Sequence, residues 1–133
     1  MRIDCITDYL AAEGLGTVGK DLFEHEMPAN TKVGILLRTP LEGIKICHEL
    51  PGYYRGRALQ AIVRAQKDET GWPLAGRLSK ALTLYKREFK DSEGRLVMRI
   101  NHLLPQTLPI TYRRSDGNGK EWSINLDASY VLL

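Results

Sequence analysis

The clearest pattern of apolar and polar positions in the chain lies in residues 109–132. From Trp122 onward, apolar or small residues occupy every second position, and mostly polar residues stand between them. Successive side chains of a strand point to opposite faces, so this stretch predicts a β-strand with one buried and one solvated face. Residues 110–114 alternate in the same way, and the Gly- and Asn-rich residues 115–120 predict a hairpin loop between the two strands.

This C-terminal hairpin sets conditions for the rest of the chain. A hairpin cannot bury its apolar face alone, so other segments must supply strands beside it and a helix across it. A straight strand over residues 121–132 would be about 40 Å long at about 3.3 Å per residue, which is long for a domain of this size. Either the strand bends, or its tip and the loop at residues 115–120 project beyond the core, where they could grip a neighbour.

Two stretches have apolar residues at helical spacing. In residues 3–13 the spacing of Ile3, Ile6 and Leu10 predicts a short helix that ends at Gly14. A second helix of about four turns is predicted to begin at Thr70, as its N-cap, with Pro73 in the first turn. Its apolar stripe and the basic residues that suit its C-terminal end are Leu74, Leu78, Ala81, Leu82, Tyr85, Lys86 and Arg87.

The remaining pattern indicates further strands. Residues 21–24, 58–66 and 96–101 each read as a strand, and the nearly continuous apolar run in residues 32–38 predicts a central one. Residues 43–50 alternate only weakly, and residues 53–57 read as a polar and aromatic link. We find no repeat or linker, and therefore predict one α+β domain over residues 1–133. Its mostly antiparallel sheet should have two helices packed on one face and a long C-terminal β-hairpin.

The composition is that of an ordinary folded domain and argues against a membrane protein or a dedicated nucleic-acid binder. The 133 residues are 43% hydrophobic and 26% charged, as in an ordinary folded domain, and no apolar run approaches the length of a membrane span. The first residues do not read as a signal peptide. Cys5 and Cys47 are far apart in the sequence, which favours a reduced compartment. The net charge of +3 falls short of what a dedicated nucleic-acid binder needs.

Residues 14–20 match two glycine-rich nucleotide-binding motifs. Gly14, Gly16 and Gly19 fit G-x-G-x-x-G, and Lys20 completes G-x-x-x-x-G-K. Both motifs need a strand before the loop and a helix after it, so that backbone N–H groups face a phosphate. Here a helix is expected before the loop and a strand after it, and Asp21 replaces the Ser or Thr that holds magnesium. A flexible connecting loop is favoured, with a nucleotide-binding module as the alternative.

Other reactive residue types do not form a recognisable site. His25, His48 and His102 are scattered, and no metal-ligand spacing of Cys and His occurs. Cys47 could pair with a histidine through folding, but a small core residue is the favoured interpretation of this cysteine. We therefore expect no enzyme activity, no catalytic residue, no metal and no cofactor.

Tyrosine and arginine residues indicate an interface. These residue types are enriched where proteins meet proteins, and they can also stack on bases. Arginines on predicted strands, Arg64, Arg95 and Arg99 among them, would add guanidinium groups to one face of the sheet. A nucleic-acid-binding module and an ordinary solvated face are the alternatives. The candidate interface residues are Tyr53, Tyr54, Arg55, Arg57, Arg113 and Arg114.

The order of several motifs resembles that of a known family. Residues 15–23 read LGTVGKDLF and end in Met27–Pro28, after which come the strand residues 34–37 and then 50–53, reading LPGY. Val63–Arg64 and a helix containing Leu74, Ala75, Leu78 and Leu82 follow. Over roughly residues 3–84 this resembles the small minor capsid or tail-terminator (head–tail joining) proteins of long-tailed bacteriophages.

The resemblance implies a small α+β protein without catalysis or cofactor. Tail terminators form a six-fold ring on the finished tail tube, stop its polymerisation and dock the head connector. The implied partners are copies of the chain itself, the tail tube protein and the head–tail connector protein, while DNA only passes through the lumen and no membrane is involved. The implied location is the virion, at the head–tail joint, with assembly in the host cytoplasm and a possible monomer in solution.

Overall fold

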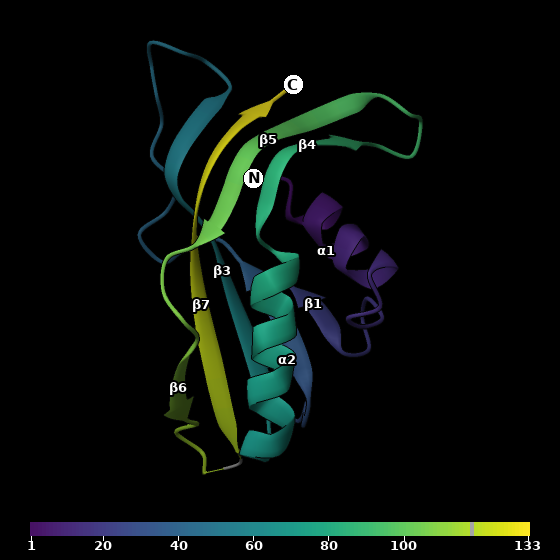
Figure 1. Ribbon diagram of the computed structural model, residues 1–133, viewed down its shortest axis with the longest axis vertical. Coiled ribbons are helices and arrows are strands. Elements are labelled where there is room, and N and C mark those ends of the chain that lie inside the picture. Colours follow the sequence, from purple (N-terminus) through teal and green to yellow (C-terminus); the bar gives the residue numbers. More distant parts are fainter. Residues whose placement is uncertain (118) are drawn as a thin grey trace.

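Two helices and seven strands form the computed structural model, which describes residues 1–117 and 119–133 (Figure 1). Asn118, in the expected hairpin loop, lies outside the described residues. The predicted α+β class is confirmed, and the sheet is mostly antiparallel. The elements are α1 (Ile3–Ala12), β1 (Leu22–Glu24), β2 (Gly34–Arg38), β3 (Tyr53–Ala65), α2 (Asp68–Ala81), β4 (Leu84–Lys90), β5 (Leu96–Pro105), β6 (Ile110–Arg113) and β7 (Lys120–Leu132).

Strand β7 lies in the middle of the sheet. Along one edge it pairs antiparallel with β3, from Val131 opposite Tyr53 to Lys120 opposite Ala65. Along its other edge it pairs antiparallel first with β5 and then with β6. The strand order is β1-β2-β3-β7-β5-β4, with β6 beside β7 outside this path. Among the described strands only the short pair β1 and β2 is parallel, and β3, β5 and β6 all pair with β7.

The period-2 pattern of β7 is confirmed by its burial. The alternate side chains Trp122, Ile124, Leu126, Ala128 and Tyr130 are all almost completely buried. The register shifts once in the β3 ladder and once in the β5 ladder of β7, and such irregularities let paired strands bend. Figure 1 shows β5 and β7 curving together toward the C-terminus. Of the two expected ways to fit a long strand, this structure uses bending.

Both helices contribute to one apolar core. Ile6 and Leu10 of α1 and Ala75 and Leu78 of α2 belong to the same buried cluster as the inward side chains of β3, β5 and β7. Helix α2 crosses β7 closely, since a side chain at Gly71 would overlap the ring of Trp122. Tyr9 joins the two helices because its hydroxyl donates a hydrogen bond to the carbonyl of Ala81 at 3.0 Å.

The second helix was predicted in the right place but with wrong ends. It begins at Asp68, with Lys67 as its N-cap, so Pro73 lies inside the helix and not in the first turn. It ends at Ala81, and Tyr85, Lys86 and Arg87 belong to β4, which pairs with β5. The sequence pattern misled because Tyr85 continues the three- and four-residue spacing of Ala81 and Leu82, although Tyr85 is an exposed residue of β4.

One interpretation between β2 and β3 also needs correction. Residues 53–57 are not a link but the first part of β3, whereas residues 43–50, which alternate only weakly, form no strand. The pairing of Tyr53 to Arg57 with the last residues of β7 supplies the ladder that a local pattern does not reveal. The predicted apolar strand is present as β2 and lies between β1 and β3.

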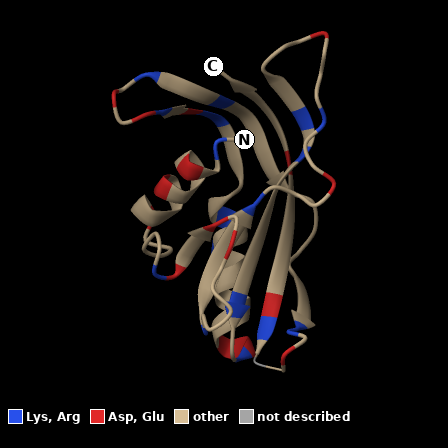
Figure 2. Ribbon diagram, turned by 180° about the vertical axis from the view of Figure 1, so that it is seen from behind, with Lys and Arg blue, Asp and Glu red and all other residues tan. Residues whose placement is uncertain are grey.

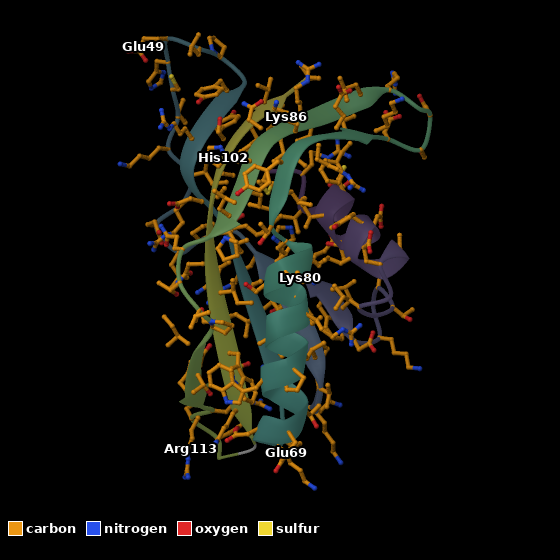
Figure 3. All side chains as sticks on the ribbon, viewed as in Figure 1. Glu49, Glu69, Lys80, Lys86, His102 and Arg113 are labelled. Carbon is orange, nitrogen blue, oxygen red and sulfur yellow. The ribbon has the colours of Figure 1, made fainter. Side chains whose placement is uncertain are left out.

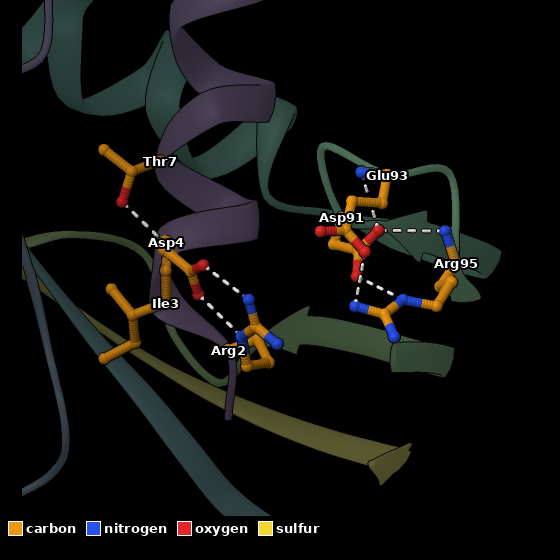
Figure 4. A network of polar contacts seen from close by, with 7 residues as sticks. All are labelled: Arg2, Ile3, Asp4, Thr7, Asp91, Glu93 and Arg95. Carbon is orange, nitrogen blue, oxygen red and sulfur yellow. Dashed lines mark hydrogen bonds and ion pairs between the residues drawn. The ribbon is translucent and has the colours of Figure 1, made fainter. Parts of the chain in front are cut away.

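The predicted turn at residues 91–94 joins β4 and β5. The carboxylate of Asp91 accepts hydrogen bonds from the backbone amides of Glu93 and Arg95, each at 2.9 Å (Figure 4). Arg95 also contacts this carboxylate through Nε at 3.3 Å. An aspartate that binds amides two and four residues ahead fixes a tight turn, and so sets the register of the β4–β5 pair.

We predict that Gly71→Ala lowers the free energy of unfolding by about 2 kcal/mol, because the added methyl group overpacks the site against the Trp122 ring. Gly76→Ala is the matched control on the same helix. Nothing lies within 4 Å of a Cβ there, so the higher helix propensity of alanine should stabilise the protein by about 0.5–1 kcal/mol. Urea denaturation measures both, and equal stability of Gly71→Ala and the native chain would contradict this packing.

Candidate interface

The predicted interface residues form two groups at opposite ends of the long strands. Tyr53, Tyr54, Arg55 and Arg57 begin β3, beside the end of β7, whereas Arg113 ends β6 beside the start of β7. Tyr53 faces Val131 and Arg113 faces Lys120, 11 positions apart on β7. At about 3.3 Å per residue, about 35 Å of strand separates the groups. The structure therefore does not bring the six residues together into one patch.

The two tyrosines are half-buried parts of the sheet. Tyr53 and Ser129 share a hydrogen bond between their hydroxyl groups at 3.1 Å. The ring of Tyr54 stacks on that of Tyr130, with centroids 5.2 Å apart. Tyr130 is buried, which raises the pKa of its hydroxyl to about 12. Its hydroxyl has no hydrogen-bond partner among the described residues. Tyr53 and Tyr54 thus stiffen this end of the sheet while exposing part of their surface.

Arg55 and Arg57, near the start of β3, line a polar hollow of about 500 Å³. Arg57 forms an ion pair with Glu42 at 2.9 Å and donates a hydrogen bond to the side-chain oxygen of Gln106 at 2.7 Å. Gly56 lies between the arginines with φ of 117°, a backbone conformation that favours glycine. Arg55 and Lys45 are exposed at the rim and form no ion pair with a described residue. The hollow therefore exposes the cations Arg55 and Lys45 to solvent, next to Arg57, which is paired with Glu42.

At the other end, Arg113 and Arg114 differ in their surroundings. The side chain of Arg114 is only 9% exposed, and it pairs with Asp116 at 2.9 Å and donates a hydrogen bond to the carbonyl of Ala29 at 2.9 Å. Arg114 therefore holds the end of β6 against the loop before β2. Arg113 is exposed on β6, and Figure 3 shows its side chain at the end of the molecule far from Glu49.

Several strand arginines are neutralised within the chain. Arg64 pairs with Glu121 at 3.0 Å, Arg95 pairs with Asp91 and Glu93, and Arg99 lies 3.9 Å from Glu88. Figure 2, seen from the side opposite α2, shows acidic and basic segments interleaved. Phosphate binding needs clustered, available cations. The arrangement offers little support for the nucleic-acid alternative.

The glycine-rich loop has an internal acceptor for its backbone. Helix α1 precedes it and β1 follows it, the reverse of the order that phosphate-binding loops need. The carboxylate of Asp21 accepts a hydrogen bond from the amide of Thr17 at 2.6 Å. A Cβ at Gly16 would lie 2.8 Å from the same carboxylate oxygen. An aspartate therefore occupies the concave side of the loop where a phosphate would have to bind.

Cys47 is next to His48 in the sequence and is partly exposed, so it is not the small core residue that was expected. No group of three His, Cys, Asp or Glu side chains with metal-binding geometry occurs among the described residues. Cys47 contacts the carboxylate of Glu49 at 3.7 Å. Cys5 is buried in α1, and burial raises the pKa of its thiol. In the described part of the chain, no helix has both the length and the apolar character to span a membrane.

Exposed apolar side chains are the feature that the sequence analysis missed. One set projects from the connection between β2 and β3, and the other lies on and just before β6. The weak alternation of residues 43–50 was the available signal for the first set, and the pattern of residues 110–114 for the second. The two sets are Leu41, Ile46 and Leu50, and Leu108, Ile110 and Tyr112.

Comparison with known proteins gives one match. A family model described as bacteriophage tail terminator protein matches residues 9–132, which is nearly the whole chain. No curated protein and no solved structure gave a significant match. The matched region includes the glycine-rich loop, both ends of the sheet and all six candidate interface residues.

We predict opposite effects for two tyrosine-to-phenylalanine changes at this end of the sheet. Tyr130→Phe should raise the free energy of unfolding by about 1 kcal/mol, because it removes a buried hydroxyl without a partner. Tyr53→Phe should lower it by about 0.5–1 kcal/mol, because it breaks the bond to Ser129. Urea denaturation at neutral pH measures both, and a loss of stability in Tyr130→Phe would show that its hydroxyl is satisfied.

Proposed function

Because the chain belongs to the bacteriophage tail terminator family, we propose that it forms a ring that caps the tail tube, stops its polymerisation and docks the head connector. The observation that carries this proposal is the family match over residues 9–132. Membership of the family makes the chain a structural component of a phage tail. The ring, the cap and the docking to the connector are the finer steps that we propose.

The sheet has the open edges that a ring-forming subunit needs. In this proposal the two helices cover one face of the sheet, and the long hairpin of β6 and β7 extends along it as a rigid block. A strand edge that stays unpaired in one copy is hidden when a neighbour covers it. β6 is exposed at all four of its residues, which supports its use at a subunit contact. Six copies in a closed ring follow from the family resemblance.

The role that we propose involves no catalysis and no cofactor. The ring assembles in the host cytoplasm and stays in the virion, at the joint between tail and head. DNA passes through its lumen without being held, and the ion pairs of Arg57, Arg64 and Arg99 with carboxylates support this. Paired guanidinium groups release few counterions from DNA, so they add little affinity for it.

We predict that the purified protein binds the ends of tail tubes and fixes their length. Tail tube protein from the same phage would be polymerised with and without a six-fold molar excess of this chain, and tube lengths measured by negative-stain electron microscopy. The expected result is short tubes of narrow length distribution, each with a ring at one end. Sedimentation velocity would measure whether the protein is monomeric before tubes are added.

Two outcomes separate this function from the alternatives. Unchanged tube length together with a protein that neither self-associates nor binds tube ends would overturn the proposal. A melting temperature that rises by several degrees with ATP and magnesium, and loses that rise in Lys20→Ala, would instead revive nucleotide binding at residues 14–20.

A further inference from the structure

We propose that residues 41–50, the arm, add as an extra strand to the free edge of β6 in the next copy of this chain. This inference rests on the proposed ring and names the contact that closes it. It makes the arm the donor and β6 the acceptor, so that each copy uses two different surfaces. Contacts of this kind, joined head to tail, close into a ring when the rotation between copies allows it.

The middle of the arm, residues 43–47, lies between turns at residues 41–42 and 48–49 and has no strand beside it among the described residues. The connection between β2 and β3 covers residues 39–52, 14 residues, a length at which loops are commonly functional. Residues 44–48 alternate like a strand, yet no backbone hydrogen bond between described residues starts from their amides. Leu41 is 87% exposed, Ile46 69% and Leu50 56%. Apolar side chains so exposed, on backbone with free donors, are suited to burial against another sheet.

The arm is held outward by specific contacts at its two ends. At its start, Glu42 pairs with Arg57 at 2.9 Å, and the amide of Gly43 bonds to the carbonyl of Pro40 at 2.9 Å. At its end, the amide of Leu50 bonds to the carbonyl of Cys47 at 3.3 Å, and that of Tyr53 to the carbonyl of Leu50 at 3.0 Å. These contacts anchor both ends, so binding a partner costs the arm less conformational entropy.

The acceptor is a vacant strand position in the sheet. β5 and β6 lie in succession along the same edge of β7, and the amide of Gln106, in the link between them, still bonds to the carbonyl of Asn125 at 2.9 Å. β4 covers the outer edge of β5 but does not extend to β6. An added strand beside β6 would continue the line of β4. Every second residue of β6 directs its N–H and C=O away from β7 and toward this position.

The outer edges of β4 and β1 are less suited to accept a strand. The outer edge of β4 carries Lys86, Arg87, Glu88 and Lys90, and Lys86 has φ of 49°. Charged side chains and local irregularity are common ways to protect an edge from pairing. β1 is only three residues long, and its end is covered by the glycine-rich loop, whose Gly19 amide bonds to the carbonyl of Leu22 at 2.9 Å. β6 instead presents Ile110, 52% exposed, and Tyr112, 42% exposed.

The position of arm and acceptor in the molecule identifies the occupant as a second copy. Figure 1 shows the β2–β3 connection and β6 near opposite ends of the long axis, and Figure 3 shows Glu49 at one end and Arg113 at the other. An arm at one end therefore meets β6 of the next copy when copies follow one another end to end. Glu49 and Arg113 have opposite charges, and neither forms an ion pair with a described residue. One ion pair between Glu49 and Arg113 of neighbouring copies would favour this pairing. The arm also carries the exposed Lys45, so the attraction comes from that pair and not from the net charge of the arm.

Disulfide trapping tests the contact, because the arm already contains Cys47, which is partly exposed, while Cys5 is buried. Tyr112→Cys and Ile110→Cys place a thiol at two successive positions on one side of β6. Mild oxidation in the presence of tail tubes should convert at least one of these variants into a ladder of covalent oligomers larger than a dimer on a non-reducing gel. A ladder requires two different crosslinking sites on each chain, as head-to-tail pairing predicts.

Matched controls make the result specific. Tyr112→Cys combined with Cys47→Ser should lose the ladder, and a strong dimer in that background would reveal β6 pairing with β6 and overturn the inference. Tyr85→Cys, on the charged edge of β4 and 64% exposed, should give no ladder with Cys47. A ladder from Tyr85→Cys in place of Tyr112→Cys would make β4 the acceptor and also contradict the proposal.

We predict that Ile46→Asp weakens ring formation by about tenfold or more, because a side chain that must be buried at the contact becomes charged. Val18→Asp changes an apolar residue that is 48% exposed outside the arm, and should leave assembly unchanged. Sedimentation velocity and counts of rings on tube ends measure both. If Ile46→Asp forms rings normally and the disulfide experiment gives no ladder through Cys47, the arm contact is overturned while the proposed ring stands. If the native protein forms no ring, the proposed function itself is overturned.

Discussion

The fold depends on β7 being paired along both of its edges. β3 covers one edge over 12 paired positions, from Tyr53 opposite Val131 to Ala65 opposite Lys120, while β5 and β6 divide the other edge between them. The alternate side chains of β7 form the centre of the core, and α2 can approach it closely because Gly71 has no side chain above Trp122. Removing that contact would separate the helix from the strand that pairs with β3, β5 and β6.

The same constraint explains how far the sequence could predict the structure. The alternation from Trp122 to Tyr130 was sufficient for β7, because one buried face imposes period 2 on a strand however its partners are arranged. The end of α2 was not predictable in this way. Tyr85 continues the helical spacing of Leu78 and Leu82, and only the pairing of β4 with β5, which places Tyr85 opposite His102, shows that it belongs to a strand. The start of β3 was missed for the same reason, because its partner is the end of β7.

The candidate interface shows that residue type alone does not predict where a side chain lies in the sheet. Residue type correctly indicated that Arg55 is exposed, but it could not distinguish Arg113, exposed on β6, from Arg114, which is nearly buried beside Asp116. Nor could it reveal that these two lie a full strand length from Tyr53. Position on a sheet is set by register, and register between β3, β6 and β7 emerges only once all three strands are paired.

Residues 43–50 show what a local pattern can and cannot specify. Alternation gives a segment the capacity to be a strand, but a strand exists only where donors and acceptors on another backbone are available. Inside this chain β2 pairs with β3 only from Gln60 to Arg64, and the arm, although it leads directly into the start of β3, forms no ladder with it among the described residues. The chain protects the edge of β4 with charges and covers the end of β1 with a loop, yet it leaves β6 apolar and open. An unpaired strand and an unprotected edge in one small protein are both liabilities for a monomer. The proposed end-to-end contact would remove both liabilities, because each segment would then satisfy the backbone groups that the other exposes.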